Sequence, residues 1–328
     1  MNNDRIQEIL DLMEEARLDY FLISDPQSIA YCTGYYNDPH ERMFVFMISK
    51  HGNHTLFMND LFYLDHDLDV NIVWHKDGQD AIQTIVDEMH FPGRIGIDKN
   101  WASHFLLDLM KKLPDAKYIN ASPCVDLVRM KKDLQEQVLM IESSKINDAV
   151  MEEIIPFIQE GVTEKQLAKK LDELFFKHHS TCYGAIVAFG KNAADPHHEN
   201  DDTLLRKGDC VLIDMGCVYK GYCSDMTRTF FYEGILEEEI KVYEIVKKAN
   251  EAAEAMIKPG VKLSDIDKCA RKVISDEGYG KYFTHRLGHF IGRDVHEYGD
   301  VSSVNEMEVE EGMIFSIEPG IYIQGEFG

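Results

Sequence analysis

The sequence has no long hydrophobic run. No stretch of its 328 residues approaches the roughly 18–20 consecutive apolar residues that a membrane-spanning helix needs. The first ten residues, MNNDRIQEIL, are too polar for a signal peptide. These two absences argue against a membrane protein and against a secretory leader.

Cysteine is sparse and irregularly spaced. The seven cysteines are an odd number, and no two of them form a CxxC motif. Secreted proteins that depend on disulfides usually carry an even and regularly spaced set. We therefore expect reduced thiols and a cytoplasmic protein, and no local pattern marks a cysteine nucleophile.

Basic residues are too few to balance the acidic ones. Lysine and arginine number 34 against 58 aspartates and glutamates, which leaves a formal net charge of −24. Such a charge repels phosphate backbones and anionic lipid, so neither nucleic acid nor a membrane surface is an expected partner. Solubility accounts for most of this acidity, which by itself does not indicate a metal site.

Several catalytic motifs are missing as well. The chain has no GxSxG elbow, no P-loop, no GxGxxG after a strand and no HExxH. The local signatures of nucleophile-elbow hydrolases, P-loop and dinucleotide binding, and helical zinc peptidases are therefore absent. No solenoid repeat or low-complexity tract is found either.

The length favours two domains. Residues 1–123 alternate helices with short strands, including a hairpin around His51-Gly52-Asn53, and predict a smaller α/β domain. Residues 124–328 carry a long helix from about residue 134 and a Thr163-x-x-Gln166 capping box that opens the next helix. Two further helices, at 236–257 and 264–277, and five predicted strands complete this part: 183–189, 209–216, 222–232, 287–291 and 312–323. The expected fold class is α+β, with helices covering one side of a mostly antiparallel curved sheet.

Two acidic residues stand out on a predicted hairpin. Asp214 follows the apolar run Val211–Ile213, and Asp225 lies on the returning strand after a turn at Lys220-Gly221. Across a two-residue loop, positions whose numbers sum to an odd value share a face, so Asp214 and Asp225 should lie on the same side. Two carboxylates placed in this way repel each other unless a cation lies between them, although two solvated hairpin acids would explain the pair equally well.

His289 and Glu318, further along the chain, favour metal chemistry over solvated acids. His289 lies in the apolar stretch LGHFIG, and Glu318 follows the apolar run MIFSI, so a carboxylate at a strand end occurs again. Hard oxygen ligands with one imidazole suit a divalent cation that activates water. His285, His296 and His197 could supply proton shuttles or donors to a tetrahedral oxyanion, although each alone could equally be a surface or core residue.

These segments resemble those of the pita-bread metallopeptidases, and within them the bacterial Xaa-Pro dipeptidases, or prolidases. The resemblance is carried by IDMGCVYKGYCSDMTRTF, YFTHRLGHFIGRDVHEYG and EEGMIFSIEPGIYI, and it extends over essentially the whole chain. It implies a pita-bread catalytic domain behind a creatinase/prolidase-type N-terminal domain, and cleavage of dipeptides with proline second by a metal-bridging hydroxide. Creatinases share this fold without the metals, but the acids retained here argue against that branch.

The resemblance also implies roles for individual residues. Asp214 would chelate one of two divalent ions, Asp225 would bridge both, and His289 and Glu318 would bind the other. Manganese is the expected metal, with cobalt or zinc as alternatives. Glu318 would also act as general base, and the resemblance assigns substrate or intermediate contacts to His197, His296, His285 and Arg286.

A surface segment suggests an assembly. The run Asp38-Pro39-His40-Glu41-Arg42 resembles a prolidase loop that approaches the active site of the partner subunit. It predicts a homodimer in which Asp38, His40 and Arg42 contribute to substrate binding. A charged surface turn is the competing interpretation.

The sequence departs from the family pattern at three points. The family's second bridging glutamate follows GIYI in a strand that reads G-x-R-x-E-D, and it would fall beyond Gly328, so we expect a C-terminally incomplete catalytic domain. Phe290 stands where the family has the glycine of HGIG, and Gly299 replaces the proline of HEYP. The departures leave three alternatives open: an Xaa-Pro aminopeptidase acting on longer peptides, a metal-poor non-catalytic homologue, and a different two-metal hydrolase.

Overall fold

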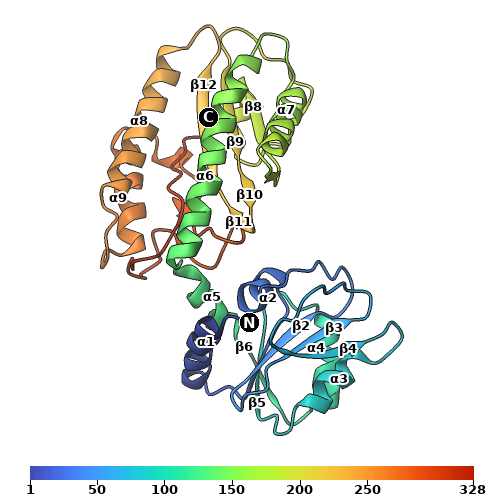
Figure 1. Cartoon of the computed structure of the whole chain (residues 1–328). Helices are drawn as coiled ribbons and strands as arrows, with labels where there is room; N and C mark the ends of the chain where they lie inside the picture. The colour runs from blue at the N-terminus through green and yellow to red at the C-terminus, as the bar shows by residue number, and fades with distance from the viewer. The chain divides into compact units, whose positions relative to one another are not determined.

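The computed structural model describes residues 1–328, and the chain separates into two compact units (Figure 1). The first unit is Met1–Arg129 and the second is Met130–Gly328. No helix in either unit is both long enough and apolar enough to cross a membrane.

The first unit is built on a mixed six-stranded sheet. The strand order is β4-β3-β2-β1-β5-β6, with β1–β2 and β2–β3 antiparallel and the other three pairs parallel. The strands are β1 Tyr20–Ile23, β2 Val45–Ser49, β3 Thr55–Asn59, β4 Asn71–His75, β5 Arg94–Ile97 and β6 Lys117–Asn120. The helices are α1 Asn3–Glu15, α2 Pro26–Thr33, α3 Ala81–Glu88, α4 Ser103–Lys112 and α5 Ser122–Met130. The predicted α/β character and the β2–β3 hairpin are confirmed.

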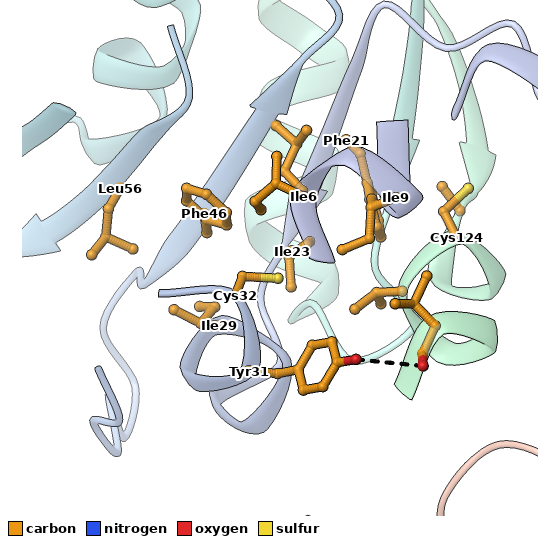
Figure 2. Close-up of a cluster of buried hydrophobic side chains, with 14 of the residues drawn as sticks. Ile6, Ile9, Phe21, Ile23, Ile29, Tyr31, Cys32, Phe46, Leu56 and Cys124 are labelled. Carbon is orange, nitrogen blue, oxygen red and sulfur yellow. Dashed lines mark hydrogen bonds between the residues drawn. The ribbon is translucent and has the colours of Figure 1, made fainter. Parts of the chain in front are cut away.

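One of the two hydrophobic clusters of this unit forms where α1 and α2 pack on the sheet (Figure 2). Ile6 and Ile9 of α1 meet Phe21 of β1 and Phe46 of β2, and all four side chains are buried. The apolar positions of α1 recur at helical spacing, so they form one stripe that leaves water on folding. Burial of this stripe is what attaches the helix to the sheet.

The second unit contains only antiparallel strand pairs, arranged with four long helices. The sheets have the orders β12-β9-β8, β11-β10-β7 and β13-β14. The strands are β7 Thr181–Cys182, β8 Ile186–Phe189, β9 Cys210–Met215, β10 Cys217–Tyr219, β11 Tyr222–Cys223, β12 Met226–Phe231, β13 Gly288–His289 and β14 Asp300–Val301. The helices are α6 Leu134–Ile154, α7 Glu164–Lys177, α8 Glu237–Glu254 and α9 Leu263–Asp276, with 3-10 turns η1 Ile155–Phe157, η2 Gly190–Ala194 and η3 Gly280–Tyr282. In Figure 1, α6 runs along the strands between α7 and the α8–α9 pair. The α+β prediction is confirmed.

Two local predictions in this unit differ from the structure. The segment 312–323 is not a continuous strand, because its main chain makes only isolated bridges, such as Phe290 with Phe315. The helix α9 begins at Leu263, one residue before the predicted start, and no side chain caps it. Instead, the backbone N–H groups of Leu263 and Ser264 donate to the carbonyls of Met307 and Asn305, so a distant segment satisfies the first turn.

We predict that Phe46→Ala destabilises the first unit by about 3–5 kcal/mol, because it removes a ring from a close-packed core and leaves a cavity. Urea unfolding of the full chain measures this loss. Leu61→Ala is the control, because Leu61 is 67% exposed and its truncation should change stability by less than about 0.5 kcal/mol. Equal costs for the two variants would contradict the assignment of Phe46 to the core.

Candidate metal centre

Asp214 and Asp225 lie on one face of a β-hairpin. β9 and β12 pair antiparallel with Asp214 opposite Thr227, and the two-residue turn is Lys220-Gly221, with φ angles of +49° and +81°. Positive φ at both central positions is the geometry of a type I′ hairpin turn. Asp225 precedes Thr227 by two residues and therefore lies diagonally from Asp214 on the same side. The predicted turn and the shared face are confirmed.

His289 and Glu318 come together through a second backbone pairing. Residues 314–318 run beside 287–291, held by the hydrogen bonds Ile291 N–Ile314 O at 3.3 Å, Ser316 N–His289 O at 2.8 Å and Glu318 N–Leu287 O at 2.8 Å. His289 is opposite Ser316, so Glu318, two residues further on, lies on the same face as His289. Both paired segments follow α9 in the chain, and their pairing brings His289 and Glu318 together.

Asp225, His289 and Glu318 form a compact cluster. The Nε2 atom of His289 lies 3.3 Å from Oδ2 of Asp225 and 3.6 Å from Oε1 of Glu318. One potential ligand atom from each residue lies within 4.8 Å of the other two. The Nδ1 atom of His289 is 3.2 Å from the carbonyl oxygen of Phe290 and donates to it, which directs Nε2 toward the two acids.

The electrostatics of the cluster favour a cation. Burial and the neighbouring Asp225 charge raise the pKa of Asp214 to about 6. Burial raises the pKa of Glu318 to about 7, although the charge of His289 partly offsets this effect. Burial alone would lower the pKa of His289, but its hydrogen bond to Asp225 and the charge of Glu318 outweigh burial and raise it. Three partly buried carboxylates with one imidazole form a donor set that fits a divalent cation.

Asp214 is further from the cluster than the other three candidate ligands are. Asp214 is outside the group whose ligand atoms lie within 4.8 Å of one another. Its carboxylate still responds most, after burial, to the charge of Asp225. Asp225 is thus the common neighbour of Asp214 on one side and His289 on the other.

A second group of acids and histidine lies elsewhere in the unit, around Glu164, His198 and Asp201. Both carboxylate oxygens of the buried Glu164 already accept hydrogen bonds within the protein. Oε1 accepts from Phe189 N and Asn192 Nδ2, each at 2.9 Å, and Oε2 accepts from Asp201 N at 3.0 Å and contacts His198 Nε2 at 2.6 Å. This residue fits a structural role better than a metal site: it holds the loop that carries His197.

Two of the predicted histidines, His296 and His197, differ in how closely they approach the cluster. The ring of His296 lies edge-on to that of His289, with centroids 4.2 Å apart. Burial and then the charge of His289 lower the pKa of His296. His197 is exposed, and its charge is among the minor causes that lower the pKa of both His285 and His296. His296 is therefore in ring contact with the cluster, whereas His197 makes no direct contact with it.

His285 and Arg286 lie shortly before His289 in the chain. Nδ1 of His285 is 2.6 Å from the carbonyl oxygen of Arg286, and Nε2 is 2.9 Å from the hydroxyl of Tyr322. Burial lowers the pKa of His285, so the neutral ring donates through Nδ1 and accepts the Tyr322 hydroxyl at Nε2. Both nitrogens are occupied, while the side chain of Arg286 is exposed.

Asp38, His40 and Arg42 belong to a surface turn of the first unit. The backbone N–H of His40 donates to Oδ1 of Asp38, and His40 takes a positive φ of +51°. The guanidinium of Arg42 binds both carboxylate oxygens of Asp77, at 3.0 and 2.9 Å. Within the unit, this turn is a self-contained network of charged groups.

Two tyrosines near the acids were missed in the sequence. The hydroxyl of Tyr183 donates to the carbonyl of Ser224 at 2.6 Å, and burial and the charges of Asp225 and Asp214 raise its pKa. Burial and the charges of Glu318 and Asp214 likewise raise the pKa of Tyr322. The chain has 15 tyrosines, so residue type alone could not single out these two.

The chain thus combines an α/β unit with an antiparallel unit whose histidine–carboxylate cluster suits a divalent cation. Residues 138–328 match the model of metallopeptidase family M24, and residues 5–131 match the creatinase/prolidase N-terminal domain. The chain belongs to metallopeptidase family M24. The predicted pita-bread fold and its two-domain organisation are confirmed.

Known proteins resemble this chain over nearly its whole length. An uncharacterized peptidase of Staphylococcus aureus strain USA300 is 34% identical and aligns over 99% of this chain and 93% of its own. A dipeptidase from Pyrococcus horikoshii has 35% identity and a TM-score of 0.91, covering 98% of this chain and 92% of that one. A prolidase from Thermococcus sibiricus has 32% identity and a TM-score of 0.92, covering 100% and 92%.

We predict that the metal-free protein loses stability as the pH rises from about 4 toward neutrality. In the unfolded chain Asp and Glu ionise near their ordinary pKa values of about 4, whereas folding raises the pKa of Asp214 to about 6 and that of Glu318 to about 7. Between these limits the folded state holds protons that the unfolded state has released. At pH values above the raised pKa values, the folded state must bury the ionised carboxylates of Asp214 and Glu318.

Urea midpoints of the metal-free protein at pH 5 and pH 8 measure this effect. The Asp214→Asn variant should show a smaller difference between the two midpoints, because it no longer buries that charge. An unchanged difference in Asp214→Asn would contradict the proposed electrostatic origin.

Proposed function

We propose that this protein is an Xaa-Pro dipeptidase that uses two divalent metal ions, of which manganese is the expected one. One observation carries the proposal: residues 225, 289 and 318 bring a carboxylate, an imidazole and a second carboxylate within 4.8 Å in a chain of a metallopeptidase family. The named prolidase and dipeptidase among its structural relatives support the choice of substrate.

Four residues would hold the ions. The imidazole of His289 is close to both Asp225 and Glu318, and the charge of Asp225 also acts on Asp214, which suits Asp225 to bridge two cations. Ions bound there would supply Lewis acidity toward the scissile carbonyl and lower the pKa of water. Cobalt or zinc would fit the same oxygen-rich set.

Glu318 is our candidate general base. Its pKa of about 7 in the metal-free protein reflects burial, and its side chain is 36% exposed, against 17% for Asp225. A carboxylate at the open side of the cluster can take a proton from water and later deliver it to the leaving proline nitrogen. Bound cations would lower this pKa, because they favour the ionised form.

His296 and His197 would act on the substrate rather than on the ions. The lowered pKa of His296 keeps its imidazole neutral at pH 7, with one N–H available to donate to a developing oxyanion. His197 would reach the substrate from its exposed loop. Arg286 is a better candidate than His285 for the substrate carboxylate, since both nitrogens of His285 are occupied.

Two further parts of the proposal concern the location and the oligomeric state of the enzyme. The seven unpaired cysteines suit a reducing compartment, so we propose a cytoplasmic enzyme. We also propose a homodimer, in which Asp38, His40 and Arg42 contribute to the partner's substrate site. Sedimentation that showed only monomer at working concentration would reject the dimer.

We expect the protein loaded with Mn²⁺ to release free proline from Met-Pro. Chromatography of the products measures this, and Ala-Ala, which lacks the proline, serves as the control substrate. Faster turnover of a tripeptide than of the dipeptide would identify an Xaa-Pro aminopeptidase instead. No proline release from the metal-loaded protein would reject peptidase activity in favour of a non-catalytic homologue.

We expect Asp225→Asn to reduce Mn²⁺ affinity by more than the roughly 10–100-fold that loss of an outer partner typically costs, because it removes a bridging charge. Asp201→Asn is the matched control: the same change in the second group of acids should leave affinity unchanged. Equilibrium dialysis with mass-spectrometric metal analysis measures both. Equal affinities for the two variants would place the metal site elsewhere.

A further inference from the structure

The ring of Phe290, the residue after His289, occupies the space that a side chain at position 299 would need. Phe290 is fully buried, and a Cβ atom placed on Gly299 would lie 2.8 Å from its Cδ2 and 3.0 Å from its Cε2. The same Cβ would also lie 3.2 Å from Cε of Met130. Gly299 has a φ of +101°, so both its conformation and its surroundings exclude a side chain.

These are the two positions at which the sequence departs from the HGIG and HEYP patterns. Proline at 299 is excluded twice, because its ring requires φ near −65° and would meet the ring of Phe290. The two departures are therefore reciprocal. A large ring at 290 requires a residue without a side chain at 299.

Phe290 and Gly299 stand at the two ends of the loop that carries His296. The carbonyl oxygen of Phe290 accepts from Nδ1 of His289 at 3.2 Å and from the backbone N–H of Glu297 at 2.9 Å. One backbone group thus links a candidate metal ligand to the residue next to His296. The ring of Phe290 also packs on that of Phe315, with centroids 5.4 Å apart.

A buried ion pair fastens the same loop. Nζ of Lys132 lies 2.8 Å from Oε2 of Glu297, and their side chains are 1% and 5% exposed. Oε1 of Glu297 accepts from the backbone N–H of Arg293 at 2.9 Å. With Glu297 held in this way, the loop cannot shift to relieve crowding at Gly299 without disturbing a buried charge pair.

We infer that Phe290 and Gly299 form an interdependent pair that positions His296 against His289. Phe290 is a positioning residue, since its ring lies beside Gly299 and packs on Phe315 rather than touching the reacting groups. The effect on turnover rests on the proposed function, but the packing dependence between the two positions does not. A side chain at 299 displaces the Phe290 ring and, through the shared carbonyl, the His296 loop.

A double-mutant cycle of Gly299→Ala and Phe290→Val tests the inference. Valine ends before the δ and ε carbons that the new methyl group would meet. Gly278→Ala is the matched control for backbone strain, because Gly278 has a φ of +89° and nothing within 4 Å of a built Cβ. Thermal unfolding midpoint, Mn²⁺ content and the separate kcat and KM for Met-Pro are measured for every variant.

We expect Gly299→Ala to lower the midpoint by at least about 3 °C more than Gly278→Ala does. Its kcat should fall about tenfold or more, with KM within about twofold, because displacement by a fraction of an ångström disrupts a catalytic geometry. In the Phe290→Val background, Gly299→Ala should lower the unfolding midpoint and kcat by no more than Gly278→Ala does. Gly278→Ala should leave kcat unchanged.

Equal costs of Gly299→Ala in the two backgrounds would overturn the interdependence. A coupling seen in the midpoint with kcat unchanged would overturn the positioning role of Phe290. If the wild type released no proline, the proposed function would fail, and the midpoint cycle would still decide whether the pair is coupled.

Discussion

The structure of the second unit depends on one electrostatic constraint: three partly buried carboxylates lie near a single imidazole. Asp214, Asp225 and Glu318 repel each other, and the raised pKa values of Asp214 and Glu318 record the cost of burying them. His289 compensates only part of this charge. A fold that keeps such a group instead of replacing it with apolar residues is adapted to hold a cation, which agrees with membership of a metallopeptidase family.

Polar contacts around the cluster hold its components in place. Asn250 of α8 donates to the carbonyl of Ile317 at 2.7 Å and so anchors the segment before Glu318. Buried Glu164 holds the loop of His197, and the Lys132–Glu297 pair holds the loop of His296. Each candidate group thus stands on backbone fixed by contacts from another part of the unit, which limits the reorganisation needed during a reaction.

The predictable parts of the fold were those with a local physical cause. The helix at Thr163 began as predicted, because the capping box with Gln166 satisfies the first N–H groups within four residues. The helix α2, for which no bounds were predicted, also has a local signal: Asp25 caps it, Pro26 begins it and Gly34 ends it with a positive φ. The start of α9 and the irregular course of 312–323 had no such signal, since distant main-chain contacts decide both.

By itself the sequence determined the fold class, the hairpin register that places Asp214 and Asp225 on one face, and a set of candidate ligands for a cation. These follow from chemistry and from the twofold period of strands, which act over short distances along the chain. Only the tertiary structure decided that Asp225, His289 and Glu318 meet, that Glu164 is already saturated with hydrogen bonds, and that Phe290 fills the space above Gly299. Such contacts join segments far apart in sequence, and their geometry exists only once the backbone has closed and its side chains have packed.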